Sequence, residues 1–184
     1  MRSIEGAIIL LSFLTLSCTK SPTFPSSGSP TTQLLVNPTF QWKGVPSLYG
    51  WSKSDSLRLY YSNDVPPGGS GNTIVFLPTG TICEGIQQII PALPGTHVYR
   101  LTFFGKSQQL DAGANVNLHP SGRDVFIGNG GATAYNTTWT FYSVVDTFTT
   151  VPGDSLYITV QEAGCEICEP NASAYINSCM LEVN

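Results

Sequence analysis

The sequence predicts an all-β fold, a two-sheet antiparallel sandwich of about eight or nine strands. Only 11% of the 184 residues are charged, against roughly 25% in a typical soluble domain. Thr, Ser, Gly and aromatic residues are frequent, a composition that favours strands over helices. Short runs of alternating apolar and polar residues follow one another, separated by Gly, Pro, Asn and Asp. No sustained 3.6-residue period is found beyond residue 34.

Eight runs carry the strand pattern, and Ile74–Leu77 is a possible ninth. The expected strands are Leu34–Gln41, Ser56–Tyr61, Thr81–Ile90, His97–Lys106, Asn115–His119, Thr138–Thr149, Ser155–Gln161 and Ala174–Val183. The Gly- and Pro-rich segments between these runs are interpreted as turns and loops, and Gly128–Gly131 is one of them.

The first 17 residues have the features of an export signal. Arg2 supplies a positive charge, Ala7–Leu14 is apolar, and the small residue Ser17 precedes Cys18. This arrangement resembles the cleavage site of bacterial lipoproteins, in which the Cys thiol receives a diacylglycerol. Residues 1–17 are therefore expected to be a lipoprotein signal peptide and Cys18 the lipidated residue. An ordinary secretory signal with a chance Cys is the alternative.

Residues 18–33 are expected to be the acylated Cys and a flexible tether, because Ser, Thr and Pro dominate the segment. The folded domain then spans 34–184. Several acyl chains anchor a protein stably, and no apolar run reaches the roughly 20 residues of a membrane-spanning helix. Thr19, rather than Asp, follows Cys18. The expected localisation is the bacterial outer membrane or cell surface, with membrane contact through the lipid anchor only.

Four blocks of sequence, in order, resemble the jelly-roll carbohydrate-binding modules of bacterial cellulases and xylanases, which have a galactose-binding-like fold. The blocks are Leu35–Gln41 with Gly50 and Trp51, Ile86–Ile89 with Pro94–Phe103, Trp139–Ser143 with Phe148, Thr149 and Leu156–Ile158, and Tyr175–Leu181. The resemblance implies that strands one, three, six and eight share one sheet. Strands two, four, five and seven then share the other, which is usually the ligand-facing sheet of that family.

Side-chain alternation in this strand order gives the second sheet an outer face with aromatic, amide and basic groups. Aromatic rings pack on the C–H face of a sugar, while amides and Arg bond its hydroxyls. The expected ligand-binding residues are Arg58, Tyr60, Arg100, Phe104, Asn117, Tyr157 and Gln161. The alternative interpretation is that these are ordinary solvent-side residues of an antiparallel sheet.

The resemblance also implies a structural calcium site near the chain ends, with acids at the positions of Gln41 and Asn177. Both residues are neutral amides here, whereas Ca²⁺ prefers carboxylates. They are therefore weak calcium candidates, and no cofactor is expected.

Four cysteines besides Cys18 are an even number in an exported domain, which favours disulfides over a zinc site. Three pairings of Cys83, Cys165, Cys168 and Cys179 are possible. In the jelly-roll order, the third and eighth strands are neighbours. This implied order favours the bonds Cys83–Cys179 and Cys165–Cys168.

The expected function is that of a surface-anchored lipoprotein whose jelly-roll domain binds a glycan without catalysis. A net charge of −4 argues against a nucleic acid partner. His97 and His119 accompany no nucleophile motif. A structural or adhesive domain that binds a protein partner is the first alternative. A small glycan-active enzyme is the second, and it would need two carboxyls about 5–9.5 Å apart across a cleft.

Overall fold

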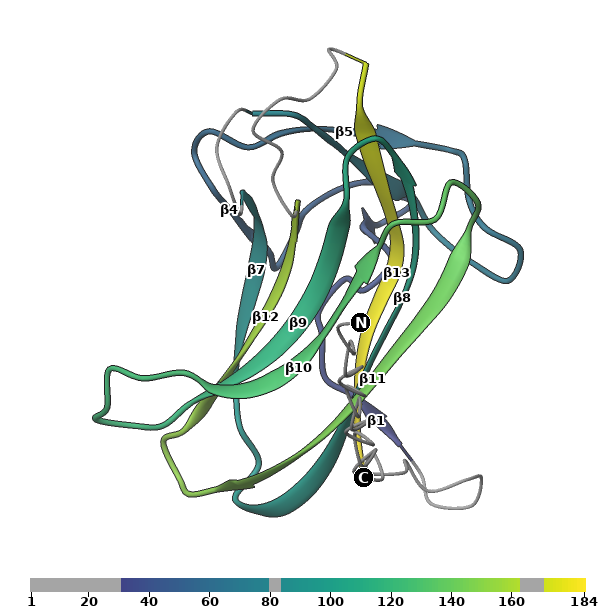
Figure 1. The fold of residues 1–184 in the computed structure, drawn as a ribbon. Coiled ribbons are helices and arrows are strands. Elements are labelled where there is room, and N and C mark those ends of the chain that lie inside the picture. The colour runs from purple at the N-terminus through teal and green to yellow at the C-terminus, as the bar shows by residue number, and fades with distance from the viewer. Residues whose placement is uncertain (1–30, 80–83, 163–170) are drawn as a thin grey trace, which may run out of the picture.

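A computed structural model of the chain describes residues 31–79, 84–162 and 171–184, and in it two antiparallel sheets face each other (Figure 1). The six-stranded sheet contains Thr32–Gln33 (β1), Arg58–Ser62 (β5), Thr73–Leu77 (β6), Gly95–Gln108 (β8), Thr140–Thr150 (β11) and Ser173–Val183 (β13). Its order is β11-β8-β13-β6-β5, with β1 beside β13. The described residues contain no helix long and apolar enough to cross a membrane.

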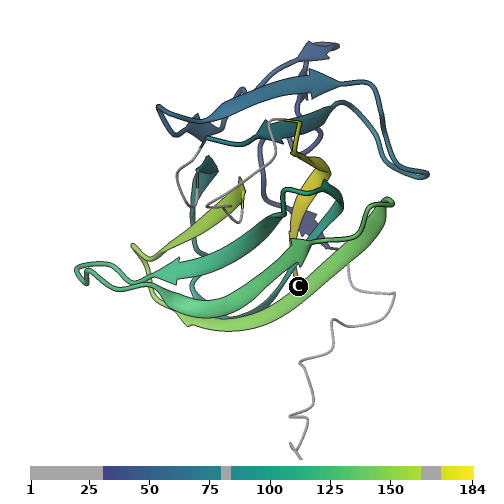
Figure 2. The same ribbon diagram turned by 45° about the horizontal axis from the view of Figure 1, so that its top comes forward.

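The five-stranded sheet has the order β10-β9-β12-β7-β4. Its strands are Ser52–Lys53 (β4), Gly85–Pro91 (β7), Ala112–His119 (β9), Ile127–Ala134 (β10) and Ser155–Glu162 (β12). A small hairpin joins Gln41–Trp42 (β2) to Val45–Pro46 (β3). The edge strands β10 and β11 belong to different sheets but lie in contact, so the two sheets meet along one side. The blue N-terminal segments lie across the molecule from these green strands (Figure 2).

The predicted alternation of side chains is confirmed in the core between the sheets. Tyr99, Leu101 and Phe103 of β8 are fully buried, and so are Leu156 and Ile158 of β12. Burying a large apolar side chain of this kind contributes about 1.5–3 kcal/mol relative to leaving it in water. The core therefore fixes which face of each strand is left for solvent.

The two-sheet sandwich is confirmed, but the predicted distribution of strands between the sheets is wrong. The third expected strand, β7, pairs with β12 rather than with β13. The fourth, β8, pairs with β11 and β13, and the second, β5, pairs with β6 in the same sheet. Alternation depends on the burial of each strand separately, so it carries no information about which strand is its neighbour.

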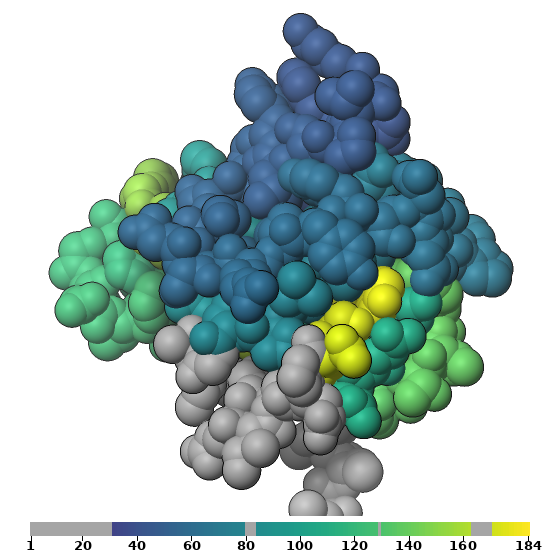
Figure 3. Space-filling model, turned by 90° about the horizontal axis from the view of Figure 1, so that it is seen from above, coloured from purple at the N-terminus to yellow at the C-terminus, as the bar shows by residue number. Residues whose placement is uncertain are grey.

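The expected strand Leu34–Gln41 is also wrong, because residues between β1 and β2 form turns. Asn37 and Phe40 have φ angles of 54° and 52°, in the left-handed region outside the range of regular strand backbone. The Asn37 side chain accepts a hydrogen bond from Gln41 N at 2.7 Å and donates one to the backbone oxygen of Ser47 at 2.8 Å. These local bonds to a side chain replace a strand ladder. In Figure 3 the N-terminal segments, in purple and blue, cover this end of the molecule.

Strand β10 occupies the segment that was expected to be a Gly-rich loop. Its register places Gly130 opposite Val116 and Gly131 opposite Asn115 of β9. A Cβ atom on either glycine would lie 3.1 Å from a side-chain carbon of that partner. Glycine in a strand allows such close approach. The sequence gives no strand signal here because glycines contribute no apolar alternation.

The strand adjacency from which the Cys83–Cys179 bond was predicted is not found, because β7 and β13 lie in different sheets. Both predicted bonds stay predictions. Cys83, Cys165 and Cys168 lie outside the described residues. Cys179 is a fully buried free thiol in β13, and burial raises its pKa to about 12.

A thiol so buried is expected to resist alkylation, because the thiolate is the nucleophile and it is not formed near neutral pH. Iodoacetamide without reductant should leave Cys179 unlabelled in the native protein and label it in guanidinium, as peptide mass mapping can measure. The fully reduced, unfolded protein is the control for complete labelling. If Cys179 stays unlabelled in guanidinium and becomes labelled only after a reductant is added, it forms a disulfide.

Candidate ligand-binding face

The solvent side of the five-stranded sheet is built mainly by two neighbouring strands, β9 and β12. Their antiparallel register places Tyr157 beside Asn117, and Thr159 beside Asn115. Alternation buries Leu156, Ile158 and Val160 and turns the residues between them outward. This side, termed the outer face below, carries side chains from β7, β9, β10 and β12: Gln87, Asn115, Asn117, His119, Thr133, Tyr157, Thr159 and Gln161.

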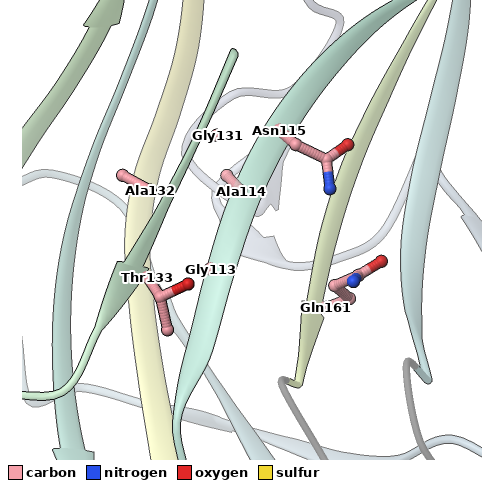
Figure 4. Close-up of a pocket in the computed structure, with 7 residues that line it drawn as sticks. All are labelled: Gly113, Ala114, Asn115, Gly131, Ala132, Thr133 and Gln161. Carbon is pink, nitrogen blue, oxygen red and sulfur yellow. The ribbon is translucent and has the colours of Figure 1, made fainter. Parts of the chain in front are cut away.

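A hollow of about 100 Å³ lies on this face over β9, β10 and β12 (Figure 4). It arises because glycines alternate with larger residues. Gly131 lies opposite Asn115, and Gly113 lies opposite Thr133. The amides of Asn115 and Gln161 extend from neighbouring strands, and Thr133 lies on the other side of β9. The hollow is therefore floored by backbone and walled by polar groups.

A second hollow, of about 290 Å³, lies over β7 and β12 next to the first one. Its lining includes Ser54, Gln87 and Thr159, and it shares Gln161 with the first hollow. Gln161 therefore stands between the two hollows and can reach a ligand in either.

The polar groups of the outer face retain capacity for hydrogen bonds. The Asn117 amide nitrogen donates to Asn115 Oδ1 at 3.0 Å, which fixes the two amides relative to each other. Within the described part of the chain, the Asn115 nitrogen, the Asn117 oxygen and the Gln161 amide bond no other side chain or backbone group. Donors and acceptors of this kind match the hydroxyls of a polar ligand.

An aromatic cluster lies at the other end of the same face. His119 and Phe126 have ring centroids 5.1 Å apart, and Tyr157 lies 5.3 Å from His119 and 5.0 Å from Phe126. Phe126 is 58% exposed, so this ring offers an apolar surface to a ligand rather than to the core. Tyr157 and Gln161 are four residues apart on one strand, about 13 Å at about 3.3 Å per residue. The cluster and the hollows thus form one continuous surface.

Asp154 holds the loop that carries Phe126. Its carboxylate accepts hydrogen bonds from the backbone N–H groups of Ser121, at 2.8 Å, and Val151, at 2.9 Å. These two bonds lower the pKa of Asp154 below its usual value, and the nearby charges of Arg123 and His119 lower it further. The loop after β9 is thereby joined to the turn before β12, directly beside the aromatic cluster.

Three of the seven expected ligand-binding residues, Asn117, Tyr157 and Gln161, lie on the outer face. The expectation that all seven share one sheet is wrong. The other four, Arg58, Tyr60, Arg100 and Phe104, belong to the six-stranded sheet because β5 and β8 pair there.

On that other sheet, the exposed side chains mainly contact one another. Arg100 forms an ion pair with Glu182, and Phe104 packs edge-to-face on Phe141 with centroids 5.1 Å apart. The Lys106 ammonium lies 4.4 Å from the Tyr175 ring centre.

Close by on the same surface, Trp139 Nε1 donates to Asp64 at 3.1 Å. A hydrogen bond from Lys106 lowers the pKa of Asp64. Polar and aromatic groups on this sheet are therefore largely engaged within the protein.

Sequence reasoning did not select Asn115, Phe126 or the hollows. Alternation alone turns Asn115 outward, so that residue was accessible to prediction. The hollows depend on Gly113 and Gly131 facing larger residues across two strands, and one of those strands, β10, was not expected. Phe126 precedes β10 in a loop, and nothing in its local sequence indicates that it contacts Tyr157.

The two weak calcium candidates lie outside the five-stranded sheet, Asn177 in β13 of the other sheet and Gln41 in the β2–β3 hairpin. Asn177 is fully buried, and its amide nitrogen donates to the backbone oxygens of Ser70 and Asn72 at 3.2 and 3.1 Å. Ser178 Oγ donates to its side-chain oxygen at 2.6 Å. Gln41 is half-buried at the start of β2. In the described ranges, no three His, Cys, Asp or Glu side chains gather as a metal site.

Solved structures with a similar fold include carbohydrate-binding modules. Family 16 Carbohydrate Binding Module-2 is similar with a TM-score of 0.57 and 20% identity, over 80% of this chain and 98% of that one. TmCBM61, solved in complex with β-1,4-galactotriose, gives a TM-score of 0.51 and 17% identity, over 82% and 97%. This chain has the jelly-roll fold of carbohydrate-binding modules.

The same fold occurs within larger proteins. An arabinose-bound α-L-arabinofuranosidase is similar with a TM-score of 0.57 and 18% identity, over 82% of this chain and 26% of that one. The chain therefore spans about a quarter of that enzyme's length. No protein-family model matches the sequence, and no curated protein matches it. The predicted all-β jelly-roll class is thus confirmed by structure rather than by sequence similarity.

Replacing Asp154 with Asn is expected to destabilise the protein at pH 7. The Asn amide is neutral and has one acceptor oxygen, whereas both oxygens of the charged Asp154 carboxylate accept backbone hydrogen bonds. The pKa of Asp154 is lower in the folded protein than in the unfolded chain. Its carboxylate therefore stabilises the folded state above the unfolded pKa, about 3.9, and this contribution is lost as pH falls through the folded pKa. The urea midpoints of parent and Asp154→Asn should therefore converge below about pH 4. Asp124→Asn, in the same loop, is the control. A midpoint difference that stays constant with pH would contradict this role.

Proposed function

We propose that this chain is a glycan-binding domain without catalytic activity, and that the outer face of the five-stranded sheet is its binding site. The observation that carries the proposal is the pair of polar hollows that share Gln161, next to an exposed aromatic cluster. A sugar has hydroxyls that need donors and acceptors, and an apolar C–H face that packs on a ring. The outer face offers both on one surface.

Two similar structures support this proposal by their own descriptions. One is named a carbohydrate-binding module, and another contains β-1,4-galactotriose. The non-catalytic part of the proposal rests on the side chains of the outer face. Among its described residues there is no pair of carboxylates, whereas glycoside hydrolysis ordinarily needs two. A domain that positions a polysaccharide without cleaving it fits this surface.

A glycan array probed with the full chain should return a ligand, whose affinity titration calorimetry then measures. Tyr157→Ala and Phe126→Ala should each weaken binding on the order of tenfold, since losing a ring contact of about 1.4 kcal/mol changes affinity tenfold. Gln161→Ala should have a comparable effect, because its amide lies between the hollows and contributes about 1 kcal/mol through hydrogen bonds.

Phe104→Ala is the matched control, since it removes an aromatic residue from the other sheet and should leave the affinity unchanged. If Phe104→Ala weakens binding while Tyr157→Ala does not, the ligand lies on the six-stranded sheet. Capture of a protein instead of any glycan would favour the adhesive alternative. Release of reducing ends from the bound glycan would favour a glycan-active enzyme.

We also propose that Cys18 is lipidated and anchors the domain to the outer membrane or cell surface. The support is the apolar run before Ser17 and Cys18 and the Ser/Thr/Pro-rich segment after them. Cys18→Ala is expected to move the protein from the membrane fraction to the soluble fraction, as immunoblotting of fractionated cells can measure. Ser17→Ala keeps a small residue before the Cys and should leave the anchor intact. Tight membrane association of Cys18→Ala would contradict the lipid anchor.

A further inference from the structure

Two acidic residues lie side by side at one end of the five-stranded sheet, where β7 begins and β12 ends. Glu162 is the last residue of β12, and Glu84 directly precedes β7. The backbone N–H of Glu162 donates to the backbone oxygen of Glu84 at 2.9 Å, so the two residues are direct neighbours. Glu162 has the inward orientation of Val160, and it is only 1% exposed.

The Glu162 carboxylate is only half satisfied. Its Oε1 accepts a hydrogen bond from Thr79 Oγ1 at 2.6 Å. Its Oε2 is buried and has no hydrogen-bond partner within the ranges that the structure describes. A buried carboxylate without compensation is costly, because removing a charge from water requires a partner of opposite charge or several hydrogen bonds.

The two ion pairs found among the described residues do not supply this compensation to Glu162. The ion pairs of the described residues join Arg100 to Glu182 and Lys106 to Asp64, and both lie in or beside the other sheet. The sequence segments that adjoin the pair, 80–83 and 163–170, contain no Lys, Arg or His. Burial raises the pKa of Glu162, the Thr79 hydrogen bond opposes this, and the charge of Glu84 raises the pKa further.

We infer that Glu84 and Glu162 bind a calcium ion at this end of the sandwich, beneath the outer face. Carboxylate oxygens are the ligands that Ca²⁺ prefers, and hydroxyl or backbone oxygens and water complete its shell of six to eight. Thr79 brings a hydroxyl oxygen to the same place from the segment that follows β6. The ion would neutralise the buried Oε2 and connect the ends of β7 and β12 to the opposite sheet.

This site is distinct from the one that the family resemblance implied around Gln41 and Asn177. At Asn177 the amide nitrogen already donates to the carbonyl oxygens that surround it. At Glu162 the buried Oε2 accepts no hydrogen bond from any residue that the structure describes. The two places therefore differ in chemistry, and only the second offers a buried carboxylate oxygen to a cation.

Thermal unfolding of the full chain is the test, with CaCl₂ as the probe and EDTA as the reference at constant ionic strength. Calcium is expected to raise the melting temperature of the parent and to bind in calorimetry with one ion per chain. The expected dissociation constant is about 10⁻⁴–10⁻³ M, the range of extracellular calcium modules. Glu162→Gln keeps an oxygen that accepts from Thr79, but it should weaken calcium binding at least tenfold.

Glu162→Gln should also melt above the parent in EDTA, because the variant removes an uncompensated buried charge. Glu182→Gln, which removes the acid paired with Arg100 on the other sheet, is the matched control and should keep the full calcium response. Glu84→Gln provides a second variant should Glu162→Gln fail to fold. An equal calcium response in the parent and in either folded variant would overturn the inference. So would stabilisation of the parent by acid alone, since a shared proton would then replace the ion.

Discussion

The antiparallel pairing of β12 with β7 on one side and β9 on the other is the constraint on which both surfaces of the five-stranded sheet depend. The pairing brings Gln161 to the boundary of two hollows and, one residue later, turns Glu162 toward the core beside Glu84. Consecutive side chains of a strand point to opposite sides. A shift of one residue in this register would therefore exchange an outward-facing amide with a buried carboxylate.

The shape of the outer face depends on glycines as much as on larger side chains. Gly113 and Gly131 face Thr133 and Asn115 across the β9–β10 pair, and the resulting hollow has a floor of backbone. A Cβ on Gly113 would lie 2.3 Å from the Ala132 oxygen, so a larger residue would separate the strands. The same glycines thus permit the close pairing of the edge strand and leave room for a ligand.

The two solvent faces of the sandwich differ in how their polar groups are used. On the six-stranded sheet, Arg100 bonds Glu182 and Lys106 bonds Asp64, so the charged groups compensate each other. On the outer face of the other sheet, the amides of Asn115 and Gln161 retain bonding capacity toward solvent. Hydrogen-bond capacity that the protein does not use internally is available to a ligand, and this difference favours one face over the other as the site.

The all-β class, most strand positions and the core-facing side chains of each strand follow from the sequence alone, because alternation depends only on local burial. Tyr99, Leu101 and Phe103 are buried as their spacing predicts, and Tyr157 and Gln161 point outward. The neighbours of each strand are known only from the three-dimensional structure, since strand pairing depends on contacts between residues far apart in the chain. It therefore moved Arg100 and Phe104 to the sheet opposite Tyr157, created β10 from a glycine-rich segment, and placed Phe126 against Tyr157.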